Sequence, residues 1–212
     1  MAKKILNLGI IGAGRIGRLH AENIVSYNRN VKLKSVSDLY FESLYDWAQS
    51  LGIENLTGNY RDILEDPEID AVLICSPTDT HAQISIEAAK AGKHIFCEKP
   101  VDMDADRIKE VLKYVQKAGV VFQVGFNRRF DRHFSKACKA VREGKVGDIH
   151  IIKITSRDPA PPTTDYIRAS GGIFMDMTIH DFDMVRYLSG SEVIEVYATG
   201  AAMIDKSIAE YG

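Results

Sequence analysis

The residues with the clearest chemical potential lie on one apolar segment near the end of the chain. On an α-helix, at ~100° per residue, Asp176, His180, Asp183 and Tyr187 fall within an arc of about 60°. Apolar residues flank this arc, which is not typical of a solvated helix face. A carboxylate one turn from an imidazole can set which ring nitrogen holds the proton and can stabilise the protonated ring, as a general base requires. The same pattern is compatible with a surface ion pair, a buried structural histidine or a metal site.

A glycine-rich segment near the start has the spacing of a dinucleotide-binding loop. Three glycines in a G-x-G-x-x-G pattern follow an apolar run and open a helical pattern, and an acid ends the next apolar run. The first glycine permits a tight turn, the second lets the backbone approach a pyrophosphate, and the third lets helix and sheet pack closely. We therefore predict cofactor contacts from Gly12, Gly14, Arg15, Ile16, Gly17 and Asp38.

The acid after the second apolar run favours NAD over NADP. Asp38 can accept hydrogen bonds from both ribose hydroxyls, and its charge would repel a 2′-phosphate. The next three residues, Leu39, Tyr40 and Phe41, supply no cation to receive such a phosphate. A helix N-cap at Asp38 is an alternative that is compatible with the same geometry.

Two further motifs follow apolar runs at positions where an α/β sheet binds ligands. The turn at 76–81 should border the cofactor, although Thr78 or Asp79 could instead cap a helix. In Glu98-Lys99-Pro100 the lysine could stabilise negative charge on a substrate oxygen, or it could be an ordinary surface lysine. The cofactor contacts predicted from these two motifs are Ser76, Pro77, Thr78, His81, Glu98 and Lys99. For His81 a structural role is the alternative.

The elements that must position these residues alternate between strand and helix over the first part of the chain. Strand-like runs are expected at 4–11, 31–37, 71–75, 94–97 and 120–124, with helices up to about 27 and near 42–50, 80–91 and 104–118, and short elements around 60–64. Most of the runs are solidly apolar, which is typical of a parallel sheet covered on both faces. We predict an α/β fold whose residues 1–124 form a Rossmann domain with a doubly wound parallel sheet.

The pattern changes after Gly125. We expect a helix at 130–143, strands at 148–156 and 193–198, a proline-rich loop at Asp158–Asp165 that could be a lid, and the helix with the acid and histidine pattern. Two strands with unpaired edges are too little sheet for an independent domain. We therefore predict that 125–212 is an incomplete α+β domain, either truncated or completed by another copy.

Basic residues begin this second part. Arg129 or Arg132 is expected on a solvated helix start, whereas Asn127 or Arg128 could reach polar groups of a substrate.

Composition and net charge limit the kinds of molecule that this chain can bind. The chain has 212 residues and a net charge of −2, which argues against a nucleic acid or an anionic membrane as partner. No apolar run approaches the ~20 residues of a membrane span. Cys75, Cys97 and Cys138 form no C-x-x-C pair, and we expect them to pack as small hydrophobic residues in a reducing compartment, the cytoplasm.

The motif at 12–17, the Glu98-Lys99-Pro100 turn, the segment 125–129 and the spacing Asp176-x-x-x-His180 occur together in this chain. In this combination the chain resembles the glucose-fructose oxidoreductase and inositol dehydrogenase family over its whole length. Segments 156–159, 171–183 and 185–188 are most similar to its myo-inositol 2-dehydrogenases.

The resemblance carries several implications. It implies a second domain whose open sheet forms oligomer interfaces and which extends beyond residue 212, and therefore a homo-oligomer, a dimer or tetramer. It also implies Lys99, Asp176 and His180 as the catalytic triad, and it suggests Arg128, Asp158 and Asp183 as substrate contacts.

We thus expect NAD-dependent oxidation of a cyclic polyol, namely the C2 hydroxyl of myo-inositol. His180 would take the hydroxyl proton, Asp176 would orient His180, and Lys99 would polarise the substrate oxygen. No metal is expected, because a lysine and a histidine supply the charge stabilisation and proton acceptance. A related enzyme for scyllo-inositol or another sugar, or a non-catalytic NAD-binding sensor, are the alternatives.

Overall fold

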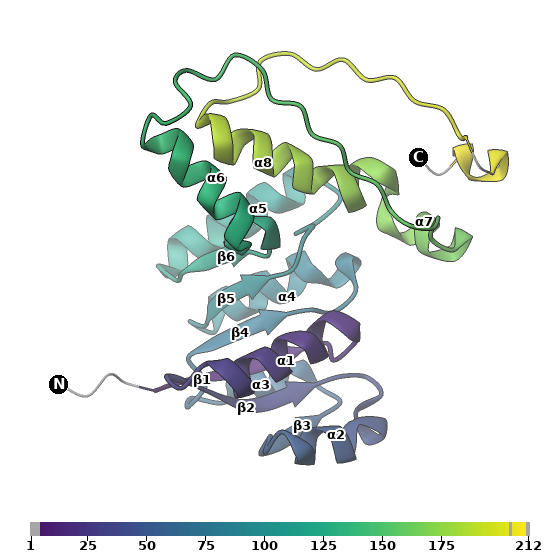
Figure 1. Cartoon of the computed structure of the whole chain (residues 1–212). Helices are drawn as coiled ribbons and strands as arrows, with labels where there is room; N and C mark the ends of the chain where they lie inside the picture. The colour runs from purple at the N-terminus through teal and green to yellow at the C-terminus, as the bar shows by residue number, and fades with distance from the viewer. Residues whose placement is uncertain (1–4, 204, 211–212) are drawn as a thin grey trace. The chain divides into compact units, whose positions relative to one another are not determined.

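The structure is a computed structural model that describes residues 5–203 and 205–210 (Figure 1). The chain separates into two compact units, Met1–Gly125 and Phe126–Gly212. Each unit is described separately below.

The first unit is built on a six-stranded sheet in the order β3-β2-β1-β4-β5-β6 (Figure 1). Every neighbouring pair is parallel. This is the doubly wound order with its reversal between β1 and β4, so the predicted Rossmann fold is confirmed. The strands are β1 (Leu6–Ile11), β2 (Val31–Ser37), β3 (Asn55–Thr57), β4 (Ala71–Ile74), β5 (His94–Cys97) and β6 (Phe122–Val124). The short β3 was not predicted.

Helices connect these strands. They are α1 (Arg15–Tyr27), the 3₁₀ turn η1 (Phe41–Leu44), α2 (Tyr45–Ser50), α3 (Tyr60–Glu65), α4 (Thr78–Lys90) and α5 (Ala105–Ala118). Helix α5 has both of its end signals in the sequence: Asp104 accepts a hydrogen bond from the backbone N–H of Asp106, and Gly119 ends the helix in the left-handed conformation. Among the described residues, no helix has the length and apolar character that a membrane crossing requires.

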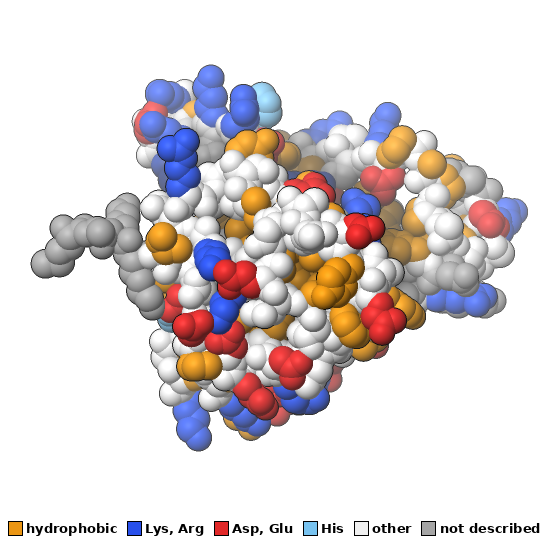
Figure 2. Space-filling model, turned by 90° about the horizontal axis from the view of Figure 1, so that it is seen from below, with side chains coloured by type: hydrophobic (Ala, Val, Ile, Leu, Met, Phe, Trp, Pro, Cys, Tyr) orange, Lys and Arg blue, Asp and Glu red, His pale blue; other side chains and the backbone are white. Residues whose placement is uncertain are grey.

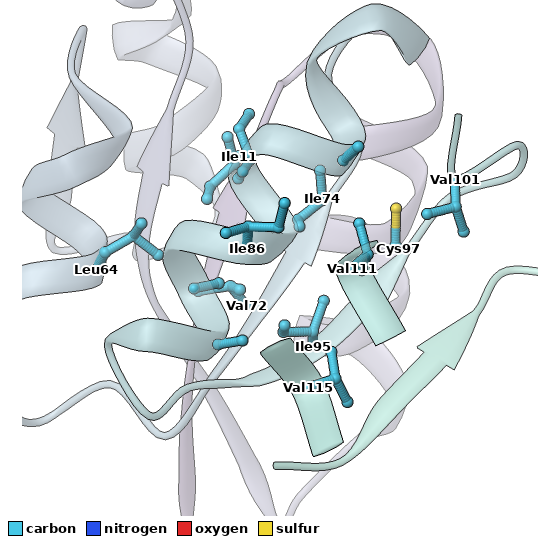
Figure 3. Packing of buried hydrophobic residues seen from close by; sticks show 14 of the residues in the cluster. Ile11, Leu64, Val72, Ile74, Ile86, Ile95, Cys97, Val101, Val111 and Val115 are labelled. Atoms are coloured by element: carbon cyan, nitrogen blue, oxygen red, sulfur yellow. The ribbon is translucent and has the colours of Figure 1, made fainter. Parts of the chain in front are cut away.

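Two apolar clusters cover the two faces of the sheet. Side chains alternate along β4: Val72 and Ile74 belong to the cluster shown in Figure 3, whereas Leu73 belongs to the other cluster. The first cluster also includes side chains of α4 and α5, such as Ile86 and Val111. Because both faces are covered, the central strands are apolar at successive positions rather than at every second one.

The three cysteines are free thiols. Cys97 and Cys138 are buried, and Cys75 is half-buried. Burial raises the pKa of the Cys97 thiol to about 12, and it also raises the pKa of Cys75. Buried neutral thiols pack as small apolar groups and are weak nucleophiles.

The described part of the second unit is helical and irregular. Its elements are η2 (Asn127–Phe130), α6 (Arg132–Arg142), α7 (Thr164–Ser170), the π-helical turn η3 (Phe174–Thr178), α8 (Ile179–Ser189) and η4 (Lys206–Glu210). The strands predicted at 148–156 and 193–198 are wrong for the structure, which has no strand there (Figure 1). A strand needs a neighbour to satisfy its backbone groups, and no strand pair is recorded for either segment.

Charged side chains of both signs lie close together on the molecular surface. On the face shown in Figure 2, acidic and basic side chains are mixed, with apolar side chains between them. In the first unit, Lys32 pairs with Glu54 at 2.5 Å and Lys34 pairs with Asp66 at 2.7 Å.

Candidate active site

The glycine loop between β1 and α1 is shaped by two glycines that the fold requires. Gly12 has φ of 92°, and a Cβ on it would lie 2.5 Å from the backbone nitrogen of Ser76. A Cβ on Gly17 would lie 2.0 Å from the carbonyl oxygen of Gly12. A side chain at either position would therefore force the loop, α1 or the β4 turn to shift.

Gly14 differs from these two glycines. A Cβ on Gly14 would lie within 4 Å of no atom of the described residues, and its φ of −67° is open to any residue. No contact with a described residue therefore calls for glycine at the N-cap of α1. The N–H groups at a helix start have no partner within the helix, and the lack of a side chain at this position permits the close approach of a pyrophosphate to them. The loop thus fits a dinucleotide.

Asp38 is tied to this loop. Its Oδ2 accepts a hydrogen bond of 2.7 Å from the backbone N–H of Ala13, and its Oδ1 accepts one of 2.9 Å from the backbone N–H of Tyr40. The second bond is a local turn around Asp38, and the N-cap residue of η1 is Tyr40. A carboxylate has about four acceptor positions, so Asp38 keeps capacity for ribose hydroxyls.

The turn after β4 is held by hydroxyl groups. The Ser76 and Thr80 side-chain oxygens lie 2.6 Å apart, and Thr80 Oγ1 donates to the carbonyl oxygen of Pro77 at 2.7 Å. Helix α4 begins at Thr78 with Pro77 at its N-cap and without a side-chain cap. Neither Thr78 nor Asp79 caps this helix, so that alternative is wrong.

His81 lies inside the fold. Its side chain is buried, with 2% of the residue exposed. Nδ1 lies 2.8 Å from the carbonyl oxygen of Pro100, and Nε2 lies 2.7 Å from the carbonyl oxygen of Ser76. The His81 side chain is therefore enclosed within the fold, where it contacts the backbone of two turns. The sequence pattern had placed it among the cofactor contacts.

Glu98 and Lys99 follow β5 at the same edge of the sheet. Glu98 Oε1 lies 2.7 Å from Nε2 of His20 on α1, and a Cβ on Gly125 would lie 3.0 Å from the Glu98 carboxylate. Lys99 is half-buried, and its peptide bond to Pro100 is cis. His20 was not predicted from the sequence, because an isolated histidine on a helix carries no signal of its partner.

The acid and histidine helix of the second unit is not a uniform α-helix. Residues Phe174–Thr178, which include Asp176, form a π-helical turn, and the α-helix starts at Ile179. The predicted arc assumed ~100° for every step, which is wrong for a π turn with its i→i+5 hydrogen bonds. Such turns often occur at functional sites.

Asp176 and His180 have aromatic neighbours. The Tyr166 hydroxyl of α7 donates a hydrogen bond of 2.9 Å to Asp176 Oδ1. The His180 ring meets Phe126 edge to face, with 6.5 Å between ring centroids. Tyr166 was not predicted, since it lies ten residues before Asp176 on a separate helix.

Two arginines join η2 to α8 through two aspartates. Arg129 donates to both carboxylate oxygens of Asp183, with Nε–Oδ2 at 2.8 Å and Nη2–Oδ1 at 2.6 Å. Asp183 is 5% exposed, whereas the Arg129 side chain is 38% exposed, so the carboxylate is the buried partner of this pair. Of the two arginines considered for a solvated helix start, Arg132 is exposed, whereas Arg129 is bound to Asp183. This bond raises the pKa of the Arg129 guanidinium.

Arg128 pairs with Asp181, which also accepts a hydrogen bond of 2.8 Å from the Ser156 hydroxyl. Asp181 was missed, although the complementary spacing of two arginines and two aspartates could have suggested it. Of the other predicted substrate contacts, Asp183 thus has a structural partner, and Asp158 is exposed in the irregular segment after α6. Among the described residues, no group of three or more His, Cys, Asp or Glu is placed to hold a metal ion.

These features agree with the comparisons with known proteins. Residues 6–126 match the oxidoreductase family with the NAD-binding Rossmann fold, and residues 134–211 match the GFO/IDH/MocA C-terminal domain. The chain belongs to this GFO/IDH/MocA oxidoreductase family, which confirms the resemblance inferred from its motifs.

Several relatives are similar over nearly the whole chain. The uncharacterized oxidoreductase YrbE of Bacillus subtilis is 58% identical over 100% of this chain and 62% of its own length. The myo-inositol 2-dehydrogenase of Thermotoga maritima is 47% identical over 98% of this chain and 62% of its own length. The chain thus spans less than two thirds of these relatives.

Solved structures show the same similarity. A probable dehydrogenase from Thermotoga maritima has a TM-score of 0.93 at 48% identity and covers 98% of this chain and 62% of its own. A scyllo-inositol dehydrogenase from Lactobacillus casei, solved with NAD(H) and scyllo-inositol, has a TM-score of 0.76 at 32% identity and covers 88% of this chain and 57% of its own.

Proposed function

We propose that this chain carries the NAD-binding and catalytic residues of an inositol dehydrogenase that oxidises the C2 hydroxyl of myo-inositol to a ketone. The observation that carries the proposal is the loop at Gly14, where the chain leaves a free space at a helix start and ties Asp38 to the same loop. The relative at 47% identity supports the choice of substrate.

Each part of the chain has its own role in this proposal. Residues 1–124 bind NAD, which supplies the hydride acceptor when bound. The cofactor is held by the glycine loop, by Asp38, and by the turns after β4 and β5. Residues 125–212 contribute substrate contacts from Arg128, Asp158 and Asp183, and take part in oligomerisation.

The catalytic residues are Lys99, Asp176 and His180. His180 accepts the proton of the substrate hydroxyl, as a histidine can near neutral pH. Asp176 keeps the imidazole in the required orientation and stabilises its protonated form. Lys99 donates a hydrogen bond to the oxygen that becomes the ketone, which stabilises the negative charge that develops there. The reaction requires no metal.

A second candidate substrate is scyllo-inositol, because a scyllo-inositol dehydrogenase is among the similar solved structures. The two substrates differ in the orientation of one hydroxyl, and discrimination depends on a few hydrogen bonds to polar groups. A non-catalytic NAD-binding sensor is the alternative from another class.

We also infer that the full-length form is a cytoplasmic homo-oligomer, a dimer or tetramer. Three free thiols support a reducing compartment, and the apolar residues of segment 193–197, such as Ile194 at 100% exposure, support a protein interface there. Light scattering of the purified protein tests the oligomer, and a monomer at micromolar concentration would contradict it.

The activity is tested by NADH formation with myo-inositol, scyllo-inositol and glucose. We expect the highest kcat/KM with myo-inositol, and a loss of at least about a hundredfold in kcat for Lys99→Ala and His180→Asn. Lys117→Ala and His133→Asn, exposed residues of the same types on α5 and α6, should retain activity. In a chain of the full length of its relatives, NADH binding without turnover of any polyol would support the sensor, and loss of activity on adding a chelator would overturn the metal-free chemistry.

A further inference from the structure

His81 joins two turns that come from different strands. Ser76, whose carbonyl oxygen lies 2.7 Å from Nε2, is in the turn after β4, and Pro100, whose carbonyl oxygen lies 2.8 Å from Nδ1, is in the turn after β5. A carbonyl oxygen only accepts, and a neutral imidazole carries a single N–H, so both contacts are hydrogen bonds at the same time only when both ring nitrogens carry a proton.

Each turn leads directly to a group of the proposed site. Ser76 is packed against the glycine loop, since its backbone nitrogen lies 2.5 Å from where a Cβ of Gly12 would be. Pro100 follows Lys99 in the chain. The imidazole of His81 therefore links the Ser76 turn, which packs against the glycine loop, to the Pro100 turn, which follows Lys99.

The burial of His81 argues that these bonds are needed. At 2% exposure the ring has no access to bulk water, and a buried polar ring costs free energy unless it is hydrogen-bonded. An apolar residue in this position of α4 would pack without that cost, as Ile84 and Ile86 do nearby on the same helix.

We propose that His81 is a positioning residue. It fixes the cofactor-binding turn at Ser76 relative to the lysine turn at Pro100, with Nε2 bound to the carbonyl oxygen of Ser76 and Nδ1 bound to that of Pro100. The proposal rests on the proposed NAD-dependent function, because it assigns Lys99 and the Ser76 turn to that chemistry. His81 itself touches neither substrate nor cofactor.

The two ring nitrogens can be tested separately. The side-chain amide of asparagine places an N–H donor near the Nδ1 position of a histidine, and that of glutamine places one near the Nε2 position. His81→Asn should keep the bond to Pro100 and lose the bond to Ser76, so NADH should bind at least about fivefold more weakly while kcat changes little. His81→Gln should keep the bond to Ser76 and lose the bond to Pro100, so kcat should fall at least about tenfold while NADH affinity changes little.

Further variants complete the series. His81→Phe keeps a buried ring without donors and should show both effects. His94→Asn and His94→Gln are matched controls, because His94 lies at the opposite end of β5, where its Nδ1 accepts a bond of 3.0 Å from the backbone N–H of Val121. Both controls should leave NADH affinity and kcat unchanged.

All measurements are made well below the thermal midpoint of each variant, so that a residue with a purely structural role lowers only that midpoint. Separation of the two effects between the asparagine and glutamine variants supports the proposal. Equal losses in both variants, or changes in thermal midpoint alone, overturn it.

One arm of the experiment does not depend on polyol oxidation. The rate of reductive methylation of Lys99, followed by mass spectrometry, should change in His81→Gln and His81→Phe and stay at the wild-type value in His81→Asn. If wild-type protein oxidises no polyol, the proposed function fails, while NADH affinity and Lys99 labelling still decide whether His81 positions the two turns.

Discussion

The backbone N–H and C=O groups of the two units find their hydrogen-bond partners in different ways. In the first unit, six parallel strands pair with one another, and both apolar clusters lie there. In the described part of the second unit the buried apolar side chains are Cys138, Ile167 and Met184, and two strand-like segments have irregular structure. Helices occur in both units.

The difference follows from where each element finds its hydrogen-bond partners. A helix closes its bonds within one segment, so α6 and α8 form from local sequence. A strand depends on a second strand that can be far away in the chain. With few buried apolar groups, the second unit relies on ionic contacts such as Arg129–Asp183, which join η2 to α8.

The largest expected contrast is in amide hydrogen exchange. Amides in β1, β4 and β5 should exchange at least about a thousandfold more slowly than those of 148–156 and 193–198, because only the former are in a paired sheet. Mass spectrometry of exchanged peptides measures this, with α8 as a protected control inside the second unit. Protection of 193–198 equal to that of β4 would mean that this segment is paired in solution.

Alanine substitutions in the glycine loop distinguish a glycine that the fold requires from a glycine that cofactor binding requires. Gly17→Ala should lower the free energy of unfolding by about 3 kcal/mol, because its Cβ would lie 2.0 Å from a backbone oxygen. Gly14→Ala should change that free energy by less than about 1 kcal/mol and weaken NADH binding instead. Urea denaturation and NADH titration distinguish the two. Equal stability of both variants would show that the loop adapts to a side chain at either glycine.

Breaking the buried ion pair tests what holds the second unit. Asp183→Asn should cost about 2 kcal/mol of unfolding free energy, less than for a fully buried pair because the Arg129 side chain is 38% exposed. The matched control is Glu192→Gln, whose pair with Arg186 is exposed and should contribute less than about 0.5 kcal/mol. A similar cost for both substitutions would contradict the role given to Asp183.

The smallest effect is an acid dependence of the first unit. A hydrogen bond from Lys34 holds the pKa of Asp66 below its ordinary value. A lowered folded-state pKa contributes stability that is present above the unfolded-state pKa of about 3.9 and is lost as the pH falls through the folded value. Lys34→Met should make the free energy of unfolding less dependent on pH between about pH 4 and pH 2, and Lys32→Met should leave this dependence unchanged. An unchanged slope in Lys34→Met would assign the acid sensitivity to other carboxylates.

Most of the first unit was predictable from its sequence. The expected strands at 31–37 and 94–97 coincide with β2 and β5, since solid apolar runs between helical patterns leave few alternatives. The short β3 was missed, because Asn55–Thr57 has too few residues to show a period.

The candidate site was predictable in part. Positions after β1, β4 and β5 follow from chain order in a parallel sheet, so Gly12 and Lys99 were placed at one edge in advance. The π turn at Asp176 was not predictable, because a helical pattern of side chains does not distinguish i→i+4 from i→i+5 backbone bonds.

By itself, the sequence determined the doubly wound fold and the glycine loop, because both depend on local residue type and on the order of elements along the chain. Only the tertiary structure decided that His81 lies behind the cofactor turn, that Asp183 is bound by Arg129, and that the last strand-like segments are irregular. These outcomes depend on partners distant in the chain, and a single sequence records which residues are present but not which of them meet.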